Sequence, residues 1–511
     1  MKFTALYVSC SSATFELSNH SIYEAPEAFD VKINGKTALE KQNRNVFSLF
    51  GLEPDTDYRI AVGEDEVLIH TLPVSVTLHL KDVTPDKTGD DTLRIQMAIA
   101  SLPKNGRLVF DAGEYHAKNL FLKSDLTLQF EKGATLYGDP EVSDYPMLPG
   151  EVDVASSPKK LQLISWEGGP RVGMASLISG FHVHNVAIVG EGTIDGQAQK
   201  GGFWNDVKHM DYARPRLCFF NDCAHIVLQG VTLTNSPSWT VHPYFSKHLR
   251  FLDFAIKNPK DAPNTDGIDI ECCEQVEAIG IRFSVGDDCI ALKSGKIYIG
   301  KTYKKPTKDV TIRNCYMLEG HGAVVLGSEA GAGLKDLDVE RCLFEKTDRG
   351  FRVKSRRGRG KDSRIDGVSF KDIRMKHVLT PLVMSMYYFC DPDGKDPEVQ
   401  DKAPHPVDET TPYLGSFTFE NIVSTDSEVA LGFFYGLPEA PIGSITIKDS
   451  SFTTAKDALQ GMPAMMCDIE ECSKLGFYFA NVRMVRFIHV KASGYEGEET
   501  ILHNVDSYKA I

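Results

Sequence analysis

The chain has 511 residues, of which 56 are lysine or arginine and 70 are aspartate or glutamate, so its formal net charge is −14. Hydrophobic residues make up 42% and charged residues 25% of the chain, a composition that supports a large core and excludes a mainly disordered protein. The acidic balance disfavours a dedicated binder of nucleic acid or of anionic membranes, because like charges repel. No apolar run reaches the roughly 18 residues expected of a transmembrane helix.

The first residues and the cysteines bear on the compartment. Leu6, Val8 and Cys10 alternate with polar residues, a pattern that favours a first β-strand over a signal peptide. The 11 cysteines are an odd number and lie mostly inside apolar, strand-like runs. They are interpreted as free thiols packed as small hydrophobic side chains, with a disulfide framework as the alternative. Both features predict a cytoplasmic protein.

Residues 1–75 are predicted to form a separate small β-sandwich. Short alternating segments such as ATFEL, FDVKI and YRIAV are separated by residues that favour turns. The segment LEPDTDY (52–58) resembles the L-x-P-x-T-x-Y signature of fibronectin type III domains, in which the tyrosine hydrogen-bonds back to the backbone at a corner. The resemblance implies an accessory domain that serves its neighbour as a spacer or a rim.

Residues 90–102 (DDTLRIQMAIASL) predict an amphipathic helix with Leu93, Met97 and Ala100 on one face. Brief strands rich in valine, leucine and phenylalanine follow it, and they alternate with turn residues. The helix is expected to cap the first strands and so to cover their unpaired edges.

A loose repeat runs from about residue 176 onward. Segments such as HNVAIVGEGTIDG (from 184), HIVLQGVTLTNSP (from 225) and DVTIRNCYMLEG (from 309) each contain a strand, a polar kink and a second strand, and they recur at about 23 to 34 residues. Period-2 strands with polar corners predict an all-β fold with a parallel β-helix over residues 76–511. A β-propeller is the alternative, but the regular blades of about 40 to 45 residues that it requires are absent.

Four polar clusters interrupt the repeat at its turns. They are PNTDGIDI with Asn264, Asp266 and Asp269, VGDDCIALKSG with Asp287, Asp288 and Lys293, EGHGAVVLGS with His321, and RGFRVKSRRGRGK with Arg352 and Lys354. Each cluster alone can be a glycine-rich turn or a solvated strand face. Successive coils of a solenoid superpose, however, so clusters about one coil apart become neighbours in space. Together they predict one groove along the β-helix.

The order NTD, GDD, GHG and R-x-K resembles the polygalacturonase family of glycoside hydrolases (family 28). GEGTIDGQ (190–197), NSPSWTVHP (235–243), GLPEAPI (436–442) and NVRMVRF (481–487) extend the resemblance over roughly residues 80–495. It implies a right-handed β-helix that cleaves pectin, in which Asp287 is the general acid and Asp266 and Asp288 position and deprotonate the attacking water. It implies no metal and no cofactor.

The resemblance also implies how the substrate is held. Arg352 and Lys354 are expected to bind the galacturonate that follows the scissile bond, His321 to hydrogen-bond the acid or the sugar, and Asn264 and His242 to bind substrate. Like-charge repulsion is expected to keep one of the three crowded carboxyl groups protonated. Residues 352–361 contain six cations, which would let an acidic protein bind a polyanion through bidentate arginine contacts.

Two long insertions, residues 144–175 and 386–412, are predicted to wall off one end of the groove. With the N-terminal sandwich, they resemble exo-acting bacterial members of the family. The predicted function is therefore hydrolysis of α-1,4-galacturonide bonds with inversion, from a chain end, on pectic oligo- or polysaccharide and with no nucleic-acid or membrane partner. The alternatives are an endo-polygalacturonase, a rhamnogalacturonan or xylogalacturonan hydrolase, a Ca²⁺-dependent pectate lyase, and a non-catalytic carbohydrate-binding β-helix.

Overall fold

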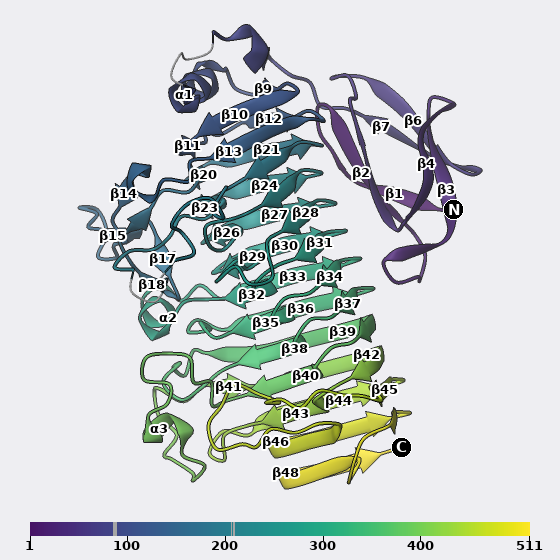
Figure 1. The fold of residues 1–511 in the computed structure, drawn as a ribbon, viewed down its shortest axis with the longest axis vertical. Coiled ribbons are helices and arrows are strands. Elements are labelled where there is room, and N and C mark those ends of the chain that lie inside the picture. The colour runs from purple at the N-terminus through teal and green to yellow at the C-terminus, as the bar shows by residue number, and fades with distance from the viewer. Residues whose placement is uncertain (85–88, 206, 208–209) are drawn as a thin grey trace.

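The computed structural model describes residues 1–84, 89–205, 207 and 210–511. A tall stack of parallel strands carries two small antiparallel sheets docked along one side (Figure 1). The stack is a single sheet of 35 strands that winds round the long axis, and each strand pairs with the equivalent strand of the next coil. The predicted parallel β-helix is confirmed.

Each coil contributes strands to three columns, one more than the two strands per repeat that the sequence indicates. The first column holds β8 (Thr77–His79), β9 (Gly106–Phe110), β12 (Leu126–Phe130), β21 (His184–Gly190), β24 (Ala224–Gln229), β27 (Lys247–Leu252), β30 (Glu274–Ile279), β33 (Thr307–Arg313) and β36 (Leu334–Glu340). The second holds β10 (Gly113–Ala117), β13 (Ala134–Gly138), β22 (Thr193–Asp195), β25 (Thr232–Thr234), β28 (Ala255–Lys257), β31 (Arg282–Ser284), β34 (Tyr316–Leu318) and β37 (Leu343–Glu345).

The third column is the one that positions the site. It holds β11 (Leu120–Phe121), β20 (Ile178–Phe181), β23 (Cys218–Asn221), β26 (Val241–Tyr244), β29 (Ile268–Glu271), β32 (Asp288–Lys293), β35 (Gly322–Gly327), β38 (Arg349–Lys354), β40 (Thr380–Ser385) and β43 (Ala430–Tyr435). Toward the C-terminus, β39 (Arg364–Lys376) and β42 (Ser416–Ser427) each span the first two columns. These columns separate again into β44 (Ile442–Lys448) of the first and β45 (Ser451–Thr454) and β47 (Lys491–Ser493) of the second. The strands β46 (Leu475–Ile488) and β48 (Thr500–Ala510) each span the third and first columns.

The core follows from stacking of like residues in register. Leu249 of β27 pairs with Val276 of β30, which pairs with Val310 of β33, and all three side chains are buried. Alternate residues of a strand point to opposite faces, so one apolar row per strand lies inside the coil and one polar row lies outside. Repetition of this pattern over many coils gives a continuous apolar interior.

The helix α1 (Thr92–Ser101) covers the N-terminal end of the stack, as predicted (Figure 1). The face assigned from the sequence is wrong, however, because Leu93 and Met97 are 65% and 62% exposed. Ile95, Ala98 and Ile99 are buried instead. Spacings of three and four residues place these three on one side of the helix, and this stripe meets the first coil. The other helices are α2 (Ile297–Tyr303) and α3 (Pro397–Gln400), and no helix among the described residues is long and apolar enough to cross a membrane.

The N-terminal residues form two antiparallel sheets. One contains β1 (Phe3–Val8), β2 (Ser12–Leu17) and β5 (Val46–Phe50), and the other contains β4 (Lys36–Arg44), β3 (Glu24–Ile33), β6 (Asp57–Val62) and β7 (Asp65–His70). The Tyr58 hydroxyl accepts a hydrogen bond from the Glu53 backbone N–H at 2.8 Å, the corner contact that the LEPDTDY pattern predicts.

These sheets dock tightly on the first column. Val46 packs with Val227 and Ile279 of the β-helix. At Gly280, which has φ 74°, an added Cβ would lie 2.6 Å from Val46 Cγ1. The absence of a side chain at Gly280 therefore allows the N-terminal sheets to dock, since any side chain there would collide with Val46.

All 11 cysteines are free thiols, and eight of them are buried. This agrees with their interpretation as small packed hydrophobic side chains.

Candidate active site

All four polar clusters reach the same side of the third column. Asp266 lies two residues before β29, Asp287 and Asp288 lie at the start of β32, and His321 directly precedes β35. Ile268 pairs with Ile290, so Asp266 and Asp288 stand at equivalent places on successive coils. Lys354, at the end of β38, pairs with Gly327 of β35. The fold thus brings the predicted residues together on stacked coils.

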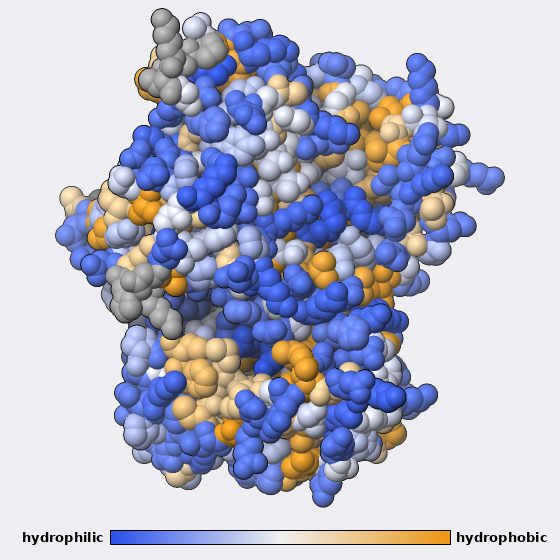
Figure 2. All heavy atoms as spheres, in the orientation of Figure 1, coloured by the Kyte–Doolittle hydropathy of each residue, from blue (hydrophilic) through white to orange (hydrophobic). Residues whose placement is uncertain are grey.

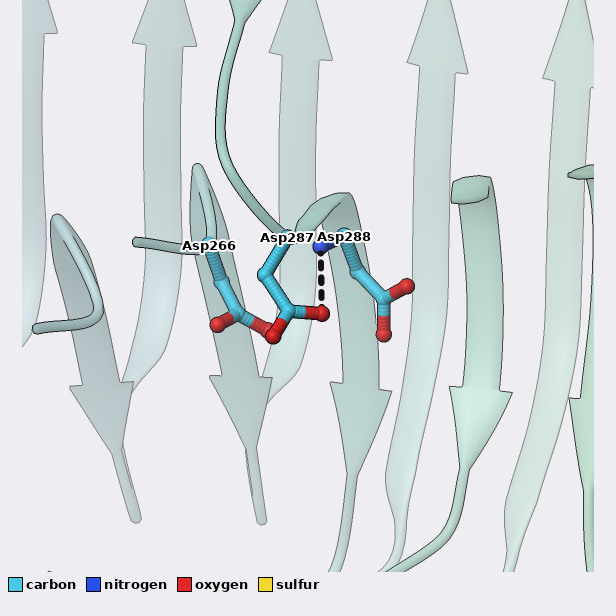
Figure 3. Close-up of side chains that lie close together, drawn as sticks. All are labelled: Asp266, Asp287 and Asp288. Carbon is cyan, nitrogen blue, oxygen red and sulfur yellow. Dashed lines mark hydrogen bonds between the residues drawn. The ribbon is translucent and has the colours of Figure 1, made fainter. Parts of the chain in front are cut away.

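Asp266, Asp287 and Asp288, called the carboxylate trio below, lie side by side; the carboxyl groups of Asp266 and Asp287 approach each other, and that of Asp288 is turned away from Asp266 (Figure 3). One carboxylate oxygen of each lies within 4.8 Å of the others. Asp287 Oδ1 also accepts a hydrogen bond of 3.0 Å from the Asp288 backbone N–H. Gly286 makes the turn possible, because a Cβ there would lie 2.2 Å from the Ala262 carbonyl oxygen.

The trio is less accessible than exposed turns would be, which corrects the sequence-based picture. Asp266 and Asp288 are only 3% and 1% exposed, and the Asp287 side chain is 22% exposed. The neighbouring coils stack against these turns and cover them. Asp266 Oδ1 and Asp288 Oδ1 are buried and have no hydrogen-bond partner among the described residues. Two unpaired buried acceptors favour a bound polar ligand such as a water molecule.

The charges of the trio are unequal. Burial, followed by the negative charges of Asp269 and Asp287, raises the pKa of Asp266 well above its ordinary value. Burial also acts on Asp287, but the hydrogen bond and charge of His321, helped by Lys354, lower its pKa to about 2. Burial and like charge therefore favour the protonated form of Asp266, whereas His321 favours the ionised form of Asp287.

His321 contacts Asp287 through both its backbone and its side chain. Its backbone N–H donates to the Asp287 carbonyl oxygen at 3.0 Å, and its Nδ1 lies 3.3 Å from Asp287 Oδ1. The hydrogen bond to Asp287 raises the pKa of His321. Gly320, with φ 112°, allows this approach, since a Cβ there would lie 2.8 Å from the Asp287 carbonyl oxygen. The imidazole is 53% exposed and can exchange protons with solvent.

Arg352 and Lys354 face the trio from β38, while Val353 between them is buried in the core. Lys354 Nζ lies 2.6 Å from Asp288 Oδ2, and Arg352 Nη1 lies 4.0 Å from Asp288 Oδ1. Arg352 also donates through Nη2 to the sulfur of Met465. Both cations are thus positioned beside the trio, as predicted, and Lys354 already pairs with one of its carboxylates.

The other four cations of the 352–361 segment have a different role from the predicted one. Arg356 binds Asp393 through two hydrogen bonds of 2.6 Å, and Arg359 binds Asp391 at 2.6 Å. Arg357 pairs with Glu439, and Lys361 pairs with Glu409. Because most of these acidic partners lie in the 386–412 insertion, the cations hold that insertion against the end of β38.

Asn264 and His242 are the remaining predicted substrate-binding residues. Asn264 is half-buried and has φ 54°, and its Oδ1 accepts a hydrogen bond of 2.5 Å from Arg214 Nη2 at the edge of the trio. His242 is completely buried, and its Nε2 lies 2.9 Å from Glu271 Oε2. Burial lowers the pKa of His242 well below its ordinary value. A side chain without accessible surface cannot contact a sugar, so that assignment is corrected to a structural one.

The 144–175 insertion, called the wall below, packs against the coil that precedes the trio. Its short strands are β14 (Met147–Leu148), β15 (Glu151–Val152), β16 (Leu161–Gln162), β17 (Ser165–Trp166), β18 (Gly169–Pro170) and β19 (Gly173–Met174). Trp166 stacks on Trp239, one coil before Asp266, with ring centroids 5.5 Å apart and an interplanar angle of 7°. At the hairpin tip, the Gly168 carbonyl accepts a hydrogen bond of 2.8 Å from the Lys296 backbone N–H.

Arg214 and Arg216 support this wall and were not singled out from the sequence. The Arg216 guanidinium lies 5.0 Å from the Trp166 ring centroid and 4.8 Å from that of Trp239. Arg214 Nη1 donates to the Pro237 carbonyl oxygen at 2.9 Å. Their i, i+2 spacing within YARPRL was the available signal, since it places both side chains on one side of an extended segment. On the molecular surface, a shaded hollow with a pale orange lower border lies at the height of β32 and β35 (Figure 2).

The carboxylate trio could also hold a cation, because its oxygens converge. The groups around it argue for different chemistry. Lys354 Nζ is already bound to Asp288, and His321 to Asp287. Carboxyl groups that already have a lysine and an imidazole as partners, and whose pKa values are shifted in opposite directions, suit acid–base catalysis.

Comparison with known proteins agrees with this geometry. The profile of the family described as "Glycosyl hydrolases family 28" matches residues 159–402. A probable polygalacturonase of Vitis vinifera is 32% identical over 304 residues, which are 57% of this chain and 59% of the relative's length. An exo-poly-alpha-D-galacturonosidase of Dickeya chrysanthemi is 24% identical over 492 residues, which are 85% of this chain and 77% of the relative.

The fold is shared along the whole chain with a solved structure. The Yersinia enterocolitica family 28 exopolygalacturonase aligns with a TM-score of 0.72 at 18% identity, and the alignment covers 99% of this chain and 98% of that one. This likeness confirms the predicted right-handed β-helix. The chain is similar to glycosyl hydrolase family 28 over residues 159–402, and the ordered motifs and the three neighbouring carboxyl groups all lie within that matched region.

Proposed function

We propose that the protein hydrolyses α-1,4-galacturonide bonds of galacturonate oligomers or polymers from a chain end. The observation that carries the proposal is the arrangement along the helix axis. The carboxylate trio lies between a wall built on Trp166 and a cationic pair, Arg352 and Lys354. A galacturonate carboxylate fits the cationic pair, because arginine and lysine bind carboxylates through charge-assisted hydrogen bonds.

The trio supplies both groups that hydrolysis requires. Asp287 and His321 form a hydrogen-bonded pair at the accessible side, suited to protonating the leaving oxygen. Asp266 Oδ1 and Asp288 Oδ1 are the unpaired acceptors, suited to holding the attacking water, and Asp288, which is paired with Lys354, is the carboxylate suited to taking its proton. The contact of 3.3 Å between His321 Nδ1 and Asp287 Oδ1 lets the imidazole pass a proton to Asp287, which then protonates the leaving oxygen.

Inversion of the anomeric carbon is part of the proposal. The two carboxyl groups of inverting glycosidases are commonly about 6.5–9.5 Å apart, whereas oxygens of the trio approach within 4.8 Å. Here three carboxyl groups share the roles of acid and base. We therefore expect the attacking water to be held by Asp266 and Asp288, next to Asp287, and not between one acid and one base. NMR of the first product formed, before mutarotation, should show the anomer opposite to that of the substrate bond; the same anomer would overturn inversion.

Exo action rests on the wall formed by the 144–175 insertion. A groove closed on the side of Trp166 accepts few sugar units before the scissile bond. Digestion of a defined galacturonate oligomer should therefore release monomer or dimer from the first time point. Mixed products of intermediate length would indicate an open groove and an endo enzyme. Unsaturated products that absorb ultraviolet light would indicate a lyase, and no release from any pectic oligomer would contradict the hydrolase.

A further inference from the structure

Lys293 is a buried cation behind the carboxylate trio that the proposed reaction does not use. It lies on β32, the strand that begins with Asp288, and is only 5% exposed. Its Nζ lies 3.0 Å from Asp269 Oδ1, 3.7 Å from Glu329 Oε2 and 3.7 Å from the Trp239 ring centroid. An ammonium group pays a large desolvation cost in such a place, so its partners must compensate for it.

Asp269 connects this cation to the trio. It lies three residues after Asp266, on β29, and is completely buried. Burial raises the pKa of Asp269 to about 7, against the opposing charge and hydrogen bond of Lys293. The charge of Lys293 also opposes the effect of burial on Asp266 and lowers the pKa of Asp287. The charge of Lys293 therefore acts on Asp266, Asp269 and Asp287 together.

The surroundings of Lys293 are otherwise acidic. Glu271 of β29 is its register partner, and Glu329 follows β35. The charged and titratable groups that face it from neighbouring elements are Asp266, Asp269, Glu271, His242, Arg216, Asp287, Asp288, Glu329 and Lys354. Acidic groups are the most numerous in this set, and Lys293 is the cation that directly contacts two of them.

We propose that Lys293 is a positioning residue that, from behind the carboxylate trio, sets the pH range in which Asp266 and Asp287 can exchange the proton of the reaction. The inference rests on the proposed hydrolase function. The sign follows from charge. A nearby cation stabilises carboxylates, so its removal makes each carboxyl group hold its proton to higher pH. Both limbs of the pH–rate profile should then move to higher pH, because both the acid and the base belong to the same cluster.

The test compares Lys293→Met and Lys293→Gln, which lack the charge, with Lys293→Arg, which keeps it. The pH dependence of kcat/KM on a galacturonate oligomer should shift upward by about one pH unit in the two neutral variants and stay in place in the arginine variant. Lys361→Gln is the matched control, since Lys361 is an exposed cation that pairs with Glu409 away from the trio. A lower rate with unchanged limbs in both neutral variants would mean a merely structural role and overturn the inference.

A second readout does not depend on turnover. Trp239 contacts Lys293, and the chain has three tryptophans, so its fluorescence can be isolated by replacing Trp166 and Trp204 with phenylalanine. The midpoint of its pH titration should rise in Lys293→Met and not in Lys361→Gln; an unchanged midpoint would overturn the inference. A raised KM for charged substrate without any pH shift would make Lys293 a substrate ligand and overturn it too. If the wild type cleaves no galacturonate oligomer, the proposed function fails, and the fluorescence titration still decides the role of Lys293.

Discussion

Asp266 and Asp287 show how two carboxyl groups on successive coils acquire opposite tendencies to ionise. Asp266 is buried and faces the negative charges of Asp269 and Asp287, so its pKa is raised well above its ordinary value. Asp287 faces His321 at the accessible side, so its pKa is lowered to about 2. Residue type alone is the same in both cases, and the neighbours decide the difference.

Replacing each member of the trio by asparagine tests these roles. Asp266→Asn, Asp287→Asn and Asp288→Asn should each lower kcat by about 10²–10⁴-fold, the range for loss of a general acid or base. Initial rates on a galacturonate oligomer measure this. An active Asp287→Asn variant would contradict the assigned acid.

The same variants should differ in stability. At acidic pH the carboxyl group of Asp266 is neutral, so an amide in its place should leave the melting temperature nearly unchanged there. The pKa of Asp266 is raised in the folded state, so the free energy of unfolding of the wild type falls as the pH rises above the ordinary pKa of an aspartate. Asp266→Asn should remove that loss. Asp288→Asn leaves Lys354 without its carboxylate and should destabilise by about 3–5 kcal/mol. Thermal unfolding at several pH values checks both, and equal losses would contradict the assignment.

Arg352 and Lys354 are expected to bind the carboxylate of the substrate. Arg352→Ala should weaken binding of a charged oligomer about ten- to a hundred-fold, because a charge-assisted hydrogen bond contributes about 1.5–3 kcal/mol. Lys354→Ala should lower kcat as well, since Lys354 also binds Asp288. The loss should be much smaller on methyl-esterified oligomers, as measured by KM on both substrates. Equal losses on both would show that these residues do not recognise the carboxylate.

At the scale of elements, the two insertions are held by specific contacts. The 144–175 insertion rests on the stack of Trp166 and Trp239, and the 386–412 insertion is tied by arginines to the end of β38. Asp391 is central to the second attachment, because it pairs with Arg356, Arg359 and Lys296. Long segments without regular structure need such anchors to keep one conformation.

Trp166→Ala should loosen the wall on the N-terminal side. The change removes the ring stacked on Trp239 and the surface that Arg216 covers. Products longer than dimer should then appear early in the digestion of a galacturonate hexamer, as followed by anion-exchange chromatography. Leu68→Ala, an exposed residue of β7, is the control and should keep the wild-type product pattern. An unchanged pattern in Trp166→Ala would mean that the wall does not limit the groove.

At the scale of the whole molecule, the N-terminal sheets are part of one rigid body with the β-helix. Glu16 is 7% exposed and binds Arg313 at 2.9 Å, Asn314 at 2.7 Å and Arg341 at 3.0 Å. Arg44 adds a contact of 2.6 Å to Asp253. These bonds connect the sandwich to several successive coils, so the sandwich braces the stack in addition to covering its side.

Glu16→Ala should therefore destabilise the whole protein. Removing one partner of a buried ion pair costs about 3–5 kcal/mol, because the other charges lose their counter-ion. Calorimetry should show a lower melting temperature, and the sandwich should unfold before the β-helix. Glu66→Ala is the control, since Glu66 pairs with Arg59 on the surface and such pairs contribute about 0–1 kcal/mol. Similar melting temperatures for the two variants would contradict a bracing role.

Much of the molecule could be predicted from pattern. The alternation of apolar and polar residues, repeated at coil length, predicted the solenoid, because each coil packs only on its neighbours and local periodicity suffices to specify it. The spacing of Asp266 and Asp288 likewise predicted their contact, since equivalent positions of successive coils superpose. The face of α1 was mistaken, because two apolar stripes compete in that segment and only the packing partner selects one.

Tertiary structure decided what no local pattern contains. His242 and Arg356 carry the same sequence signals as groove residues, yet one is buried on Glu271 and the other binds an insertion 35 to 37 residues away. The opposite pKa shifts of Asp266 and Asp287 likewise depend on burial, on Asp269 beside the first and on His321 beside the second. Burial and charge pairing are sums over neighbours from distant parts of the chain, so they exist only once the coils and insertions are assembled.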